Sequence, residues 1–370
     1  MIRATKRRTS AWLLTVAALG CMASAAAEAK DRVRISLVLG ATGTEFSGEQ
    51  RAGANAAIRD LNRANPGKNV ALKVTGPAQI DPGQEVQMFQ SEAATLPDAI
   101  IVAPIPPSLF TEPALQVQRQ GIPLVYLMSP PSRGVDNVLF VGQREYDVGR
   151  RVANLIADRI VAKSGGKAGA DITGVIVPGT CVPGMENLDD RMLGVHAAFK
   201  ERLPKVEVLA DMNTGNERGN GYAVWQQAVQ ARPNALAFLG ACENDSTNIA
   251  KIKEDDKRSY EVIAFDTPEP VRNSLKVGSI AAAVPPSHFA SAYMAVWISG
   301  SALLSDRKVP TGWLQTYITV IDDKNKAVFD RASLPPANLE AFYRLHVEAL
   351  KKVDTSKLPP LSAARAPGRG

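Results

Sequence analysis

The chain has 370 residues, of which 45% are hydrophobic, so it is long enough for two domains and too apolar to be disordered as a whole. The formal net charge is +6, and half of this excess lies in the first 29 residues, which hold four basic residues and one acid. The remaining body is close to neutral and has no basic stripe, which argues against a nucleic-acid partner.

Residues 1–29 have the three-part pattern of a secretory signal peptide. A basic start is followed by the apolar run AWLLTVAALG and then by small residues up to Ala29. This run is too short to anchor the chain, and no later segment is long enough to span a membrane, so we expect export to the periplasm. Two variants stay open: Cys21 in ALGC resembles a lipoprotein acceptor, and Arg7 and Arg8 are compatible with a twin-arginine signal.

Strand-like and helix-like segments alternate along the rest of the chain. Apolar strand-like runs lie at 33–39, 70–74, 98–103, 122–128, 137–142, 171–177, 205–212, 235–241, 260–266, 279–284 and 314–321. Helical spacing follows the first run at Ala54, Ala57, Ile58 and Leu61, and similar spacing follows most of the others. The alternation predicts an α/β fold of two doubly wound parallel-sheet lobes, divided near Gly142.

The loop after the first strand, GATGTEF, raises the question of a dinucleotide site. Gly40 and Gly43 fit that fingerprint, but Phe46 occupies the position of the third glycine. The second strand is also not closed by an acid, since the first one after it is Asp81. We therefore expect no nicotinamide cofactor, and no histidine or cysteine spacing indicates a metal.

Five segments in the same order resemble the sugar-binding family of periplasmic solute-binding proteins, the ribose-binding type that serves ABC importers. They are EFSGEQRAGANAAIRDL (45–61), QGIPLVYLMS (120–129), RMLGVHAAF (191–199), GYAVWQQAVQARPNALAFLGACENDS (221–246) and VIAFDTPEPVRNSLKVGSIAAAV (262–284). The resemblance extends over roughly residues 32–325. It implies the type I fold, in which three crossovers join two lobes, here near Gly142–Arg144, Val284–Ser287 and Leu314–Tyr317.

The lobe boundaries follow from these crossovers. We expect one lobe from residues 30–142 with 286–314, and the other from residues 143–285 with 315–335. Residues 336–370 are expected to form one more helix and a disordered tail, because the sequence ends in PPLSAARAPGRG.

The resemblance also implies a set of ligand-binding residues. These are Thr44, Phe46, Ser129, Arg191, Asn244 and Asp266. Phe46 would offer an aromatic face to a sugar ring, Arg191 a fork of donors, and Asp266 a carboxylate for a pair of hydroxyls. The alternatives are a core phenylalanine, a surface arginine and a helix N-cap. Either Asn244 or Asp245 could face the cleft, and capping of the next helix is the other interpretation.

Several positions depart from the sugar-reading pattern. Met128 and Ser129 stand where the family has an Asp-Arg pair, Ala103 replaces an asparagine, Asn216 an aromatic residue and Pro286 a glutamine. Because buried polar groups need partners, this loss favours a less hydroxylated ligand, or one with a single charged group for Arg191.

Cys181 and Cys242 follow strands that are neighbours if the second lobe has the usual 2-1-3-4-5 strand order. A disulfide at the cleft rim is one possibility, since an exported chain can keep one. The other is a pair of free thiols. A catalytic thiol served by His196 has no recognised spacing, and we expect no catalytic residues.

These features predict a monomeric periplasmic protein that binds a small-molecule ligand, a sugar or sugar-like compound, and delivers it to the membrane permease of an ABC importer by hinge closure. One alternative is a sensory module of the same fold that signals to a membrane kinase or chemoreceptor. The other, from a different class, is an exported enzyme.

Overall fold

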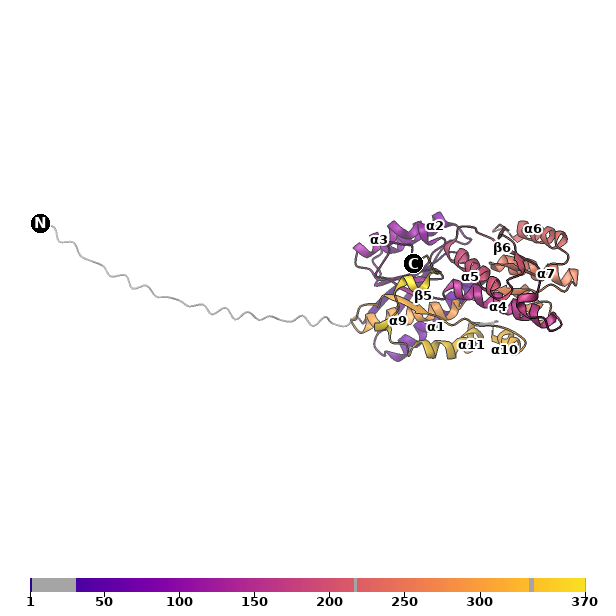
Figure 1. Cartoon of the computed structure of the whole chain (residues 1–370). Coiled ribbons are helices and arrows are strands. Elements are labelled where there is room, and N and C mark those ends of the chain that lie inside the picture. The colour runs from indigo at the N-terminus through magenta and orange to yellow at the C-terminus, as the bar shows by residue number, and fades with distance from the viewer. Residues whose placement is uncertain (2–30, 216–217, 333–335, 370) are drawn as a thin grey trace.

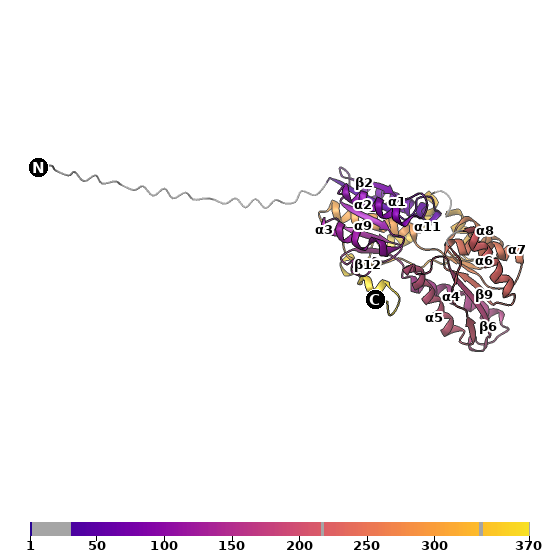
Figure 2. The ribbon, with the colours of Figure 1, turned by 90° about the horizontal axis from the view of Figure 1, so that it is seen from above.

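The computed structural model of the chain describes Met1 and residues 31–215, 218–332 and 336–369. The expected leader from residue 2 onward, with Cys21, and also Asn216 lie outside the described residues. The elements form two lobes that lie side by side, as Figures 1 and 2 show. None of the helices in the described ranges combines the length and the apolar character needed to cross a bilayer.

The first lobe is built on a six-stranded parallel sheet in the order β12-β5-β4-β3-β1-β2. Its strands are β1 (Arg32–Leu39), β2 (Asn69–Thr75), β3 (Ala99–Ala103), β4 (Leu124–Leu127), β5 (Leu139–Gly142) and β12 (Gly312–Gln315). Its helices are α1 (Glu45–Ala64), α2 (Pro82–Ala94), α3 (Thr111–Arg119) and α9 (His288–Leu304). The central strands are apolar on both faces because α1 and α9 cover one face and α2 and α3 cover the other.

The second lobe has the same plan. Its strands are β6 (Gly174–Thr180), β7 (Val206–Val208), β8 (Met212–Asn213), β9 (Ala237–Gly240), β10 (Ile263–Phe265) and β11 (Ala282–Val284). Its helices are α4 (Glu145–Lys163), α5 (Glu186–Arg202), α6 (Arg218–Ala231), α7 (Glu243–Asp256) and α8 (Glu269–Val277). Strand β6 pairs with β7, β8 and β9, and a bridge between Ala237 and Glu261 continues the layer toward β10 and β11. The strands that precede Cys181 and Cys242 are therefore neighbours.

The three expected crossovers connect the lobes and touch one another. The Gln143 amide and the Ser287 hydroxyl both donate to the Tyr317 carbonyl, at 2.6 and 2.7 Å, and Thr316 N–H donates to the Gly142 carbonyl at 3.1 Å. These residues lie in the three segments at which the sequence predicts the crossovers. Because the crossovers are short and adjacent, the lobes can rotate about a common axis while each keeps its own core.

The C-terminal segment differs from the expected disorder. After α10 (Lys326–Ala332) on the second lobe, α11 (Pro336–Leu350) packs against α1 and α9 of the first. Residues 351–369 then follow in two short 3-10 turns, Thr355–Lys357 and Leu361–Ala364. Ala364 and Ala366 are each 2% exposed. These small apolar side chains therefore hold the tail against the rest of the protein, although the tail contains prolines and glycines.

Candidate functional site

A cleft of ≈ 710 Å³ lies between the lobes and is lined by residues of both lobes and of the crossovers. It lies beyond the carboxyl ends of the strands, where ligands bind in open α/β sheets. Apolar side chains line much of it, among them Phe46, Ile105 and Met128 from the first lobe, and Met185 and Leu188 from the second. Its volume and mixed lining suit a small organic ligand.

Five of the six expected ligand-binding residues line this cleft. They are Thr44, Phe46, Arg191, Asn244 and Asp266. Ser129 does not belong to the lining: it is 1% exposed, and its N–H donates to the Leu127 carbonyl at 2.7 Å at the end of β4. Of the positions that depart from the sugar-reading pattern, Met128 and Pro286 line the cleft, and the fully buried Ala103 does not.

Thr44 and Phe46 are positioned by the start of α1. The Thr44 hydroxyl caps the helix by accepting from Ser47 N–H at 3.3 Å, which is the role that threonine commonly has at this position. Phe46 follows in the first turn, and its ring centroid lies 5.6 Å from that of His288. The phenylalanine therefore presents a partly buried ring at the cleft wall.

Asp266 follows β10 with φ +61°, in the left-handed region that few non-glycine residues adopt. It does not cap α8, whose N-cap is Pro268. Its carboxylate lies 3.6 Å from Nε2 of His288, the first residue of α9 in the other lobe. Burial lowers the pKa of His288, but the hydrogen bond and charge of Asp266, together with the charges of Glu49 and Glu243, outweigh burial and raise this pKa above its ordinary value.

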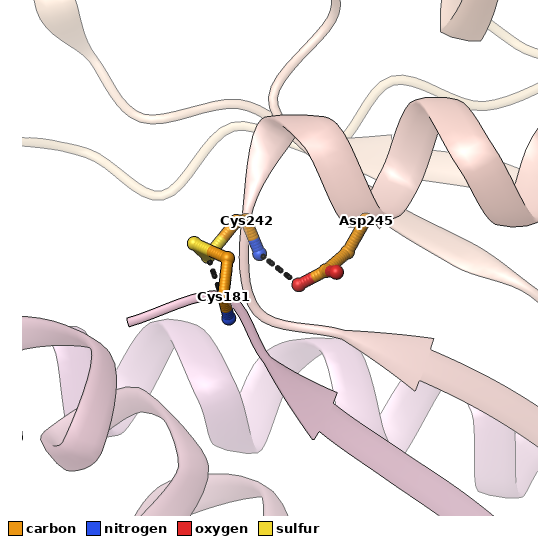
Figure 3. Close-up of side chains that lie close together, drawn as sticks. All are labelled: Cys181, Cys242 and Asp245. Atoms are coloured by element: carbon orange, nitrogen blue, oxygen red, sulfur yellow. Dashed lines mark hydrogen bonds between the residues drawn. A yellow bond between two sulfur atoms is a disulfide. The ribbon is translucent and has the colours of Figure 1, made fainter. Parts of the chain in front are cut away.

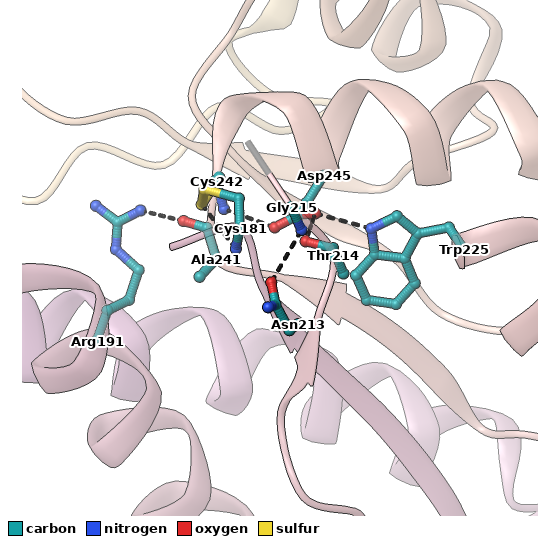
Figure 4. The surroundings of a disulfide bond; sticks show 9 residues. All are labelled: Cys181, Arg191, Asn213, Thr214, Gly215, Trp225, Ala241, Cys242 and Asp245. Carbon is teal, nitrogen blue, oxygen red and sulfur yellow. Dashed lines mark hydrogen bonds between the residues drawn. A yellow bond between two sulfur atoms is a disulfide. The ribbon is translucent and has the colours of Figure 1, made fainter. Parts of the chain in front are cut away.

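Asn244 and Asp245 have separate roles in the first turn of α7. Asn244 lines the cleft. Asp245 is not among the lining residues, and its carboxylate accepts from the Thr214 hydroxyl at 2.6 Å, the Trp225 indole at 2.8 Å and Cys242 N–H at 3.3 Å (Figure 4). Of the two, Asn244 is thus the residue at the cleft, and Asp245 takes part in the cap of α7.

Arg191 is buried between α5 and α4. Its Nε donates to Glu145 Oε2 at 2.8 Å, its Nη2 lies 2.7 Å from the same oxygen, and its Nη1 donates to the Ala241 carbonyl. Its guanidinium also lies 4.4 Å from the ring centroid of Phe265, within cation–π range. Burial raises the pKa of the Glu145 carboxyl, and the Arg191 charge opposes that rise. The arginine lines the cleft with its charge already balanced.

Two glycines allow this pair to form. A Cβ at Gly149 of α4 would lie 1.9 Å from the Arg191 carbonyl oxygen, and one at Gly194 of α5 would lie 2.0 Å from the Tyr146 carbonyl oxygen. The helices therefore approach more closely than any other residue type would permit. This close packing brings Glu145 and Arg191, which are far apart in the sequence, into contact.

A disulfide between Cys181 and Cys242 forms part of the cleft lining, with an S–S distance of 1.95 Å (Figures 3 and 4). It joins the loops that follow β6 and β9. Cys181, Cys242 and Asp245 have donor atoms close enough together for a metal ion. The two sulfurs are bonded to each other, and the aspartate already accepts three hydrogen bonds, so this group does not fit a metal site.

Several polar residues of the cleft were not among the ligand-binding residues expected from the sequence. Glu145, Gln143, Ser287 and His288 all lie at or beside the crossovers. None belongs to a motif, and each reaches the cleft only because the crossovers converge there. The one indication of a cleft residue was the glutamate directly after the first expected crossover. This indication is weak unless the fold is known.

The lobes contact each other across the cleft, and we call this arrangement closed. Glu45 in α1 and Arg272 in α8 form an ion pair of 3.0 Å across the two lobes. Ile105 of the first lobe is buried in a hydrophobic cluster whose other buried members all belong to the second lobe. The Asp266–His288 contact also joins the lobes.

A family model described as a periplasmic binding protein domain matches residues 35–305. The fold is similar to that of a glucose-galactose binding protein from Geobacillus stearothermophilus (TM-score 0.66, 22% identity, 80% of this chain and 99% of that one). It is also similar to an ABC transporter solute-binding protein from Agrobacterium vitis bound to α-D-tagatopyranose (TM-score 0.65, 23% identity, 79% and 95%). An arabinose-binding protein from Geobacillus stearothermophilus gives a TM-score of 0.68 at 20% identity, with 80% and 99% covered. No curated protein sequence matches the chain significantly.

Proposed function

The chain belongs to the periplasmic binding protein domain family, and from that premise we propose that it is an exported solute-binding protein for a sugar or sugar-like ligand. It acts in the periplasm as a monomer and hands the ligand to the permease of an ABC importer. The ligand leaves the protein chemically unchanged.

The observation that carries this proposal is the cleft itself. Residues of both lobes line it, and contacts such as Glu45–Arg272 and Asp266–His288 join the lobes around it. A ligand that touches both walls stabilises the closed arrangement relative to the open one and so shifts the population toward closure. A permease that recognises only the closed arrangement would then receive loaded protein.

The charges of the cleft favour a neutral ligand over an anionic one. Among the described residues that line it, Arg191 is a cation and His288 becomes one when it is protonated, and each already lies beside a carboxylate. Glu243 adds a further acid to the lining. An anionic ligand would therefore find no cation without a counter-charge, and this supports a neutral ligand over one with a charged group for Arg191.

We expect a thermal-shift screen of sugars and polyols to find compounds that raise the melting temperature. Stabilisation follows RT ln(1 + [L]/Kd) and reaches about 2.7 kcal/mol at a hundredfold excess over Kd. In a matched series on one ring, D-glucuronate should stabilise less than D-glucose and D-glucosamine, with an affinity lower by about tenfold or more. Failure of every sugar and polyol to stabilise the protein would contradict the proposed function. Preferred binding of D-glucuronate would contradict only the charge argument.

A further inference from the structure

The end of the chain runs from the first lobe to the second. Pro359 accepts a hydrogen bond from Trp313 N–H of β12 at 2.9 Å, and Ala364 is buried in the core between the first sheet and α2 and α3. Figure 2 shows this yellow segment next to β12 and α5. The tail is therefore anchored on the first lobe up to about residue 364.

Arg365 then bonds to both lobes at once. Its Nη2 donates to the Pro131 carbonyl of the first lobe, and its Nη1 pairs with the Glu186 carboxylate at the start of α5 in the second. Its own carbonyl accepts from Nε of Arg144 at 2.9 Å, in the first crossover. The residue is 6% exposed, so these contacts are largely protected from competing water.

The next residues continue the same connection. Ala366 N–H donates to Asp190 Oδ2 at 2.9 Å, and Nη1 of Arg369 lies 3.4 Å from Asp190 Oδ1. The Arg369 carbonyl in turn accepts from Arg133 Nη2 of the first lobe at 2.8 Å. Residues 365–369 thus link the β4–β5 loop of one lobe to the first turns of α5 in the other. We call this segment the interlobe strap.

The part of α5 that the strap holds is also a wall of the cleft. Asn187, Leu188 and Arg191 line the cleft, and they alternate with Glu186 and Asp190, which bind the strap. A tail that fixes these turns relative to the first lobe fixes the cleft wall as well.

We propose that the interlobe strap positions the cleft-lining turns of α5 and biases the lobes toward the closed arrangement. The inference rests on the proposed hinge closure and concerns its regulation. The bonds of Arg365 to Pro131 and Glu186 cannot all persist if α5 moves away from the first lobe. Opening therefore breaks charge-assisted hydrogen bonds that closure restores, and the open-to-closed ratio depends on them.

The test is small-angle scattering of the ligand-free protein together with thermal unfolding. Arg365→Ala should raise the open-to-closed ratio by about tenfold and so increase the radius of gyration. Glu186→Ala, at the partly exposed end of the same pair, should also increase the radius of gyration. It replaces the first variant in the test if that variant folds poorly. The double variant should match Arg365→Ala, because that substitution alone already removes the pair with Glu186. The radius of gyration of Arg365→Lys should lie between those of wild type and Arg365→Ala.

Arg150→Ala is the matched control. Arg150 pairs with Glu201 of α5 at 2.6 Å, but both residues belong to the second lobe. This variant removes an ion pair from the same helix without touching the strap, and its radius of gyration should equal that of wild type. An unchanged radius in Arg365→Ala and Glu186→Ala would overturn the proposal, and so would an equal increase in Arg150→Ala. A failed ligand screen would leave this result unaffected, because no ligand is added.

Discussion

Reduction of the Cys181–Cys242 disulfide is expected to lower the free energy of unfolding by about 4 kcal/mol. The bond closes a loop with a sequence separation of 61 residues, and the chain-entropy account assigns about that stabilisation to a loop of this length. The measurement is urea unfolding with and without reductant. The loops after β6 and β9 both lie at the cleft, so ligand affinity should fall as well.

The Cys181→Ala/Cys242→Ala double variant is the control for this experiment. It should unfold at the lower urea concentration in both buffers, and reductant should not shift it further. Thiol titration of unfolded, unreduced wild-type protein should detect neither the Cys181 nor the Cys242 thiol. Detection of both, or an unfolding curve of wild type that reductant leaves in place, would show that the bond contributes nothing in solution.

Glu145→Ala is expected to destabilise the protein by about 3–5 kcal/mol, because it leaves the buried guanidinium of Arg191 without its counter-charge. The side chains of Arg191 and Glu145 are only 4% and 8% exposed, so water cannot replace the lost partner. Chemical denaturation measures this change. Glu145→Ala/Arg191→Met also removes the unpaired arginine charge and should recover much of the lost free energy of unfolding.

The pair between Arg150 and Glu201 is the comparison for that variant. It joins the same two helices at the surface, and Glu201→Ala should leave the unfolding transition nearly where it was. Equal stability of Glu145→Ala and wild type would mean that Arg191 reaches solvent or finds another partner.

The sequence was sufficient to predict the two-lobe architecture, because its buried strands are apolar over their whole length and each is followed by helical spacing. The neighbouring position of Cys181 and Cys242 also followed once the usual strand order of doubly wound sheets was assumed. Such features repeat along the chain and depend on local pattern, so they are readable without a structure.

Features that depend on packing between distant segments were not predictable. The partner of Arg191 is Glu145, and their contact requires the close approach of α4 and α5 at Gly149 and Gly194. His288 has no motif around it and reaches Asp266 only across the closed cleft. The composition of the tail indicated disorder, whereas its order comes from α5 and the first lobe, which supply the partners of Arg365.

Calorimetric titration of Asp266→Asn tests most directly whether the cleft between the lobes is the binding site. The titrant is the compound that gives the largest stabilisation in the screen. We predict that its affinity falls by about 10- to 100-fold, since an amide loses the charge-assisted hydrogen bonds that a carboxylate makes to hydroxyls. Ser129→Ala, which alters a residue behind the lining, should bind as wild type does. Equal affinity of Asp266→Asn and wild type would contradict the account.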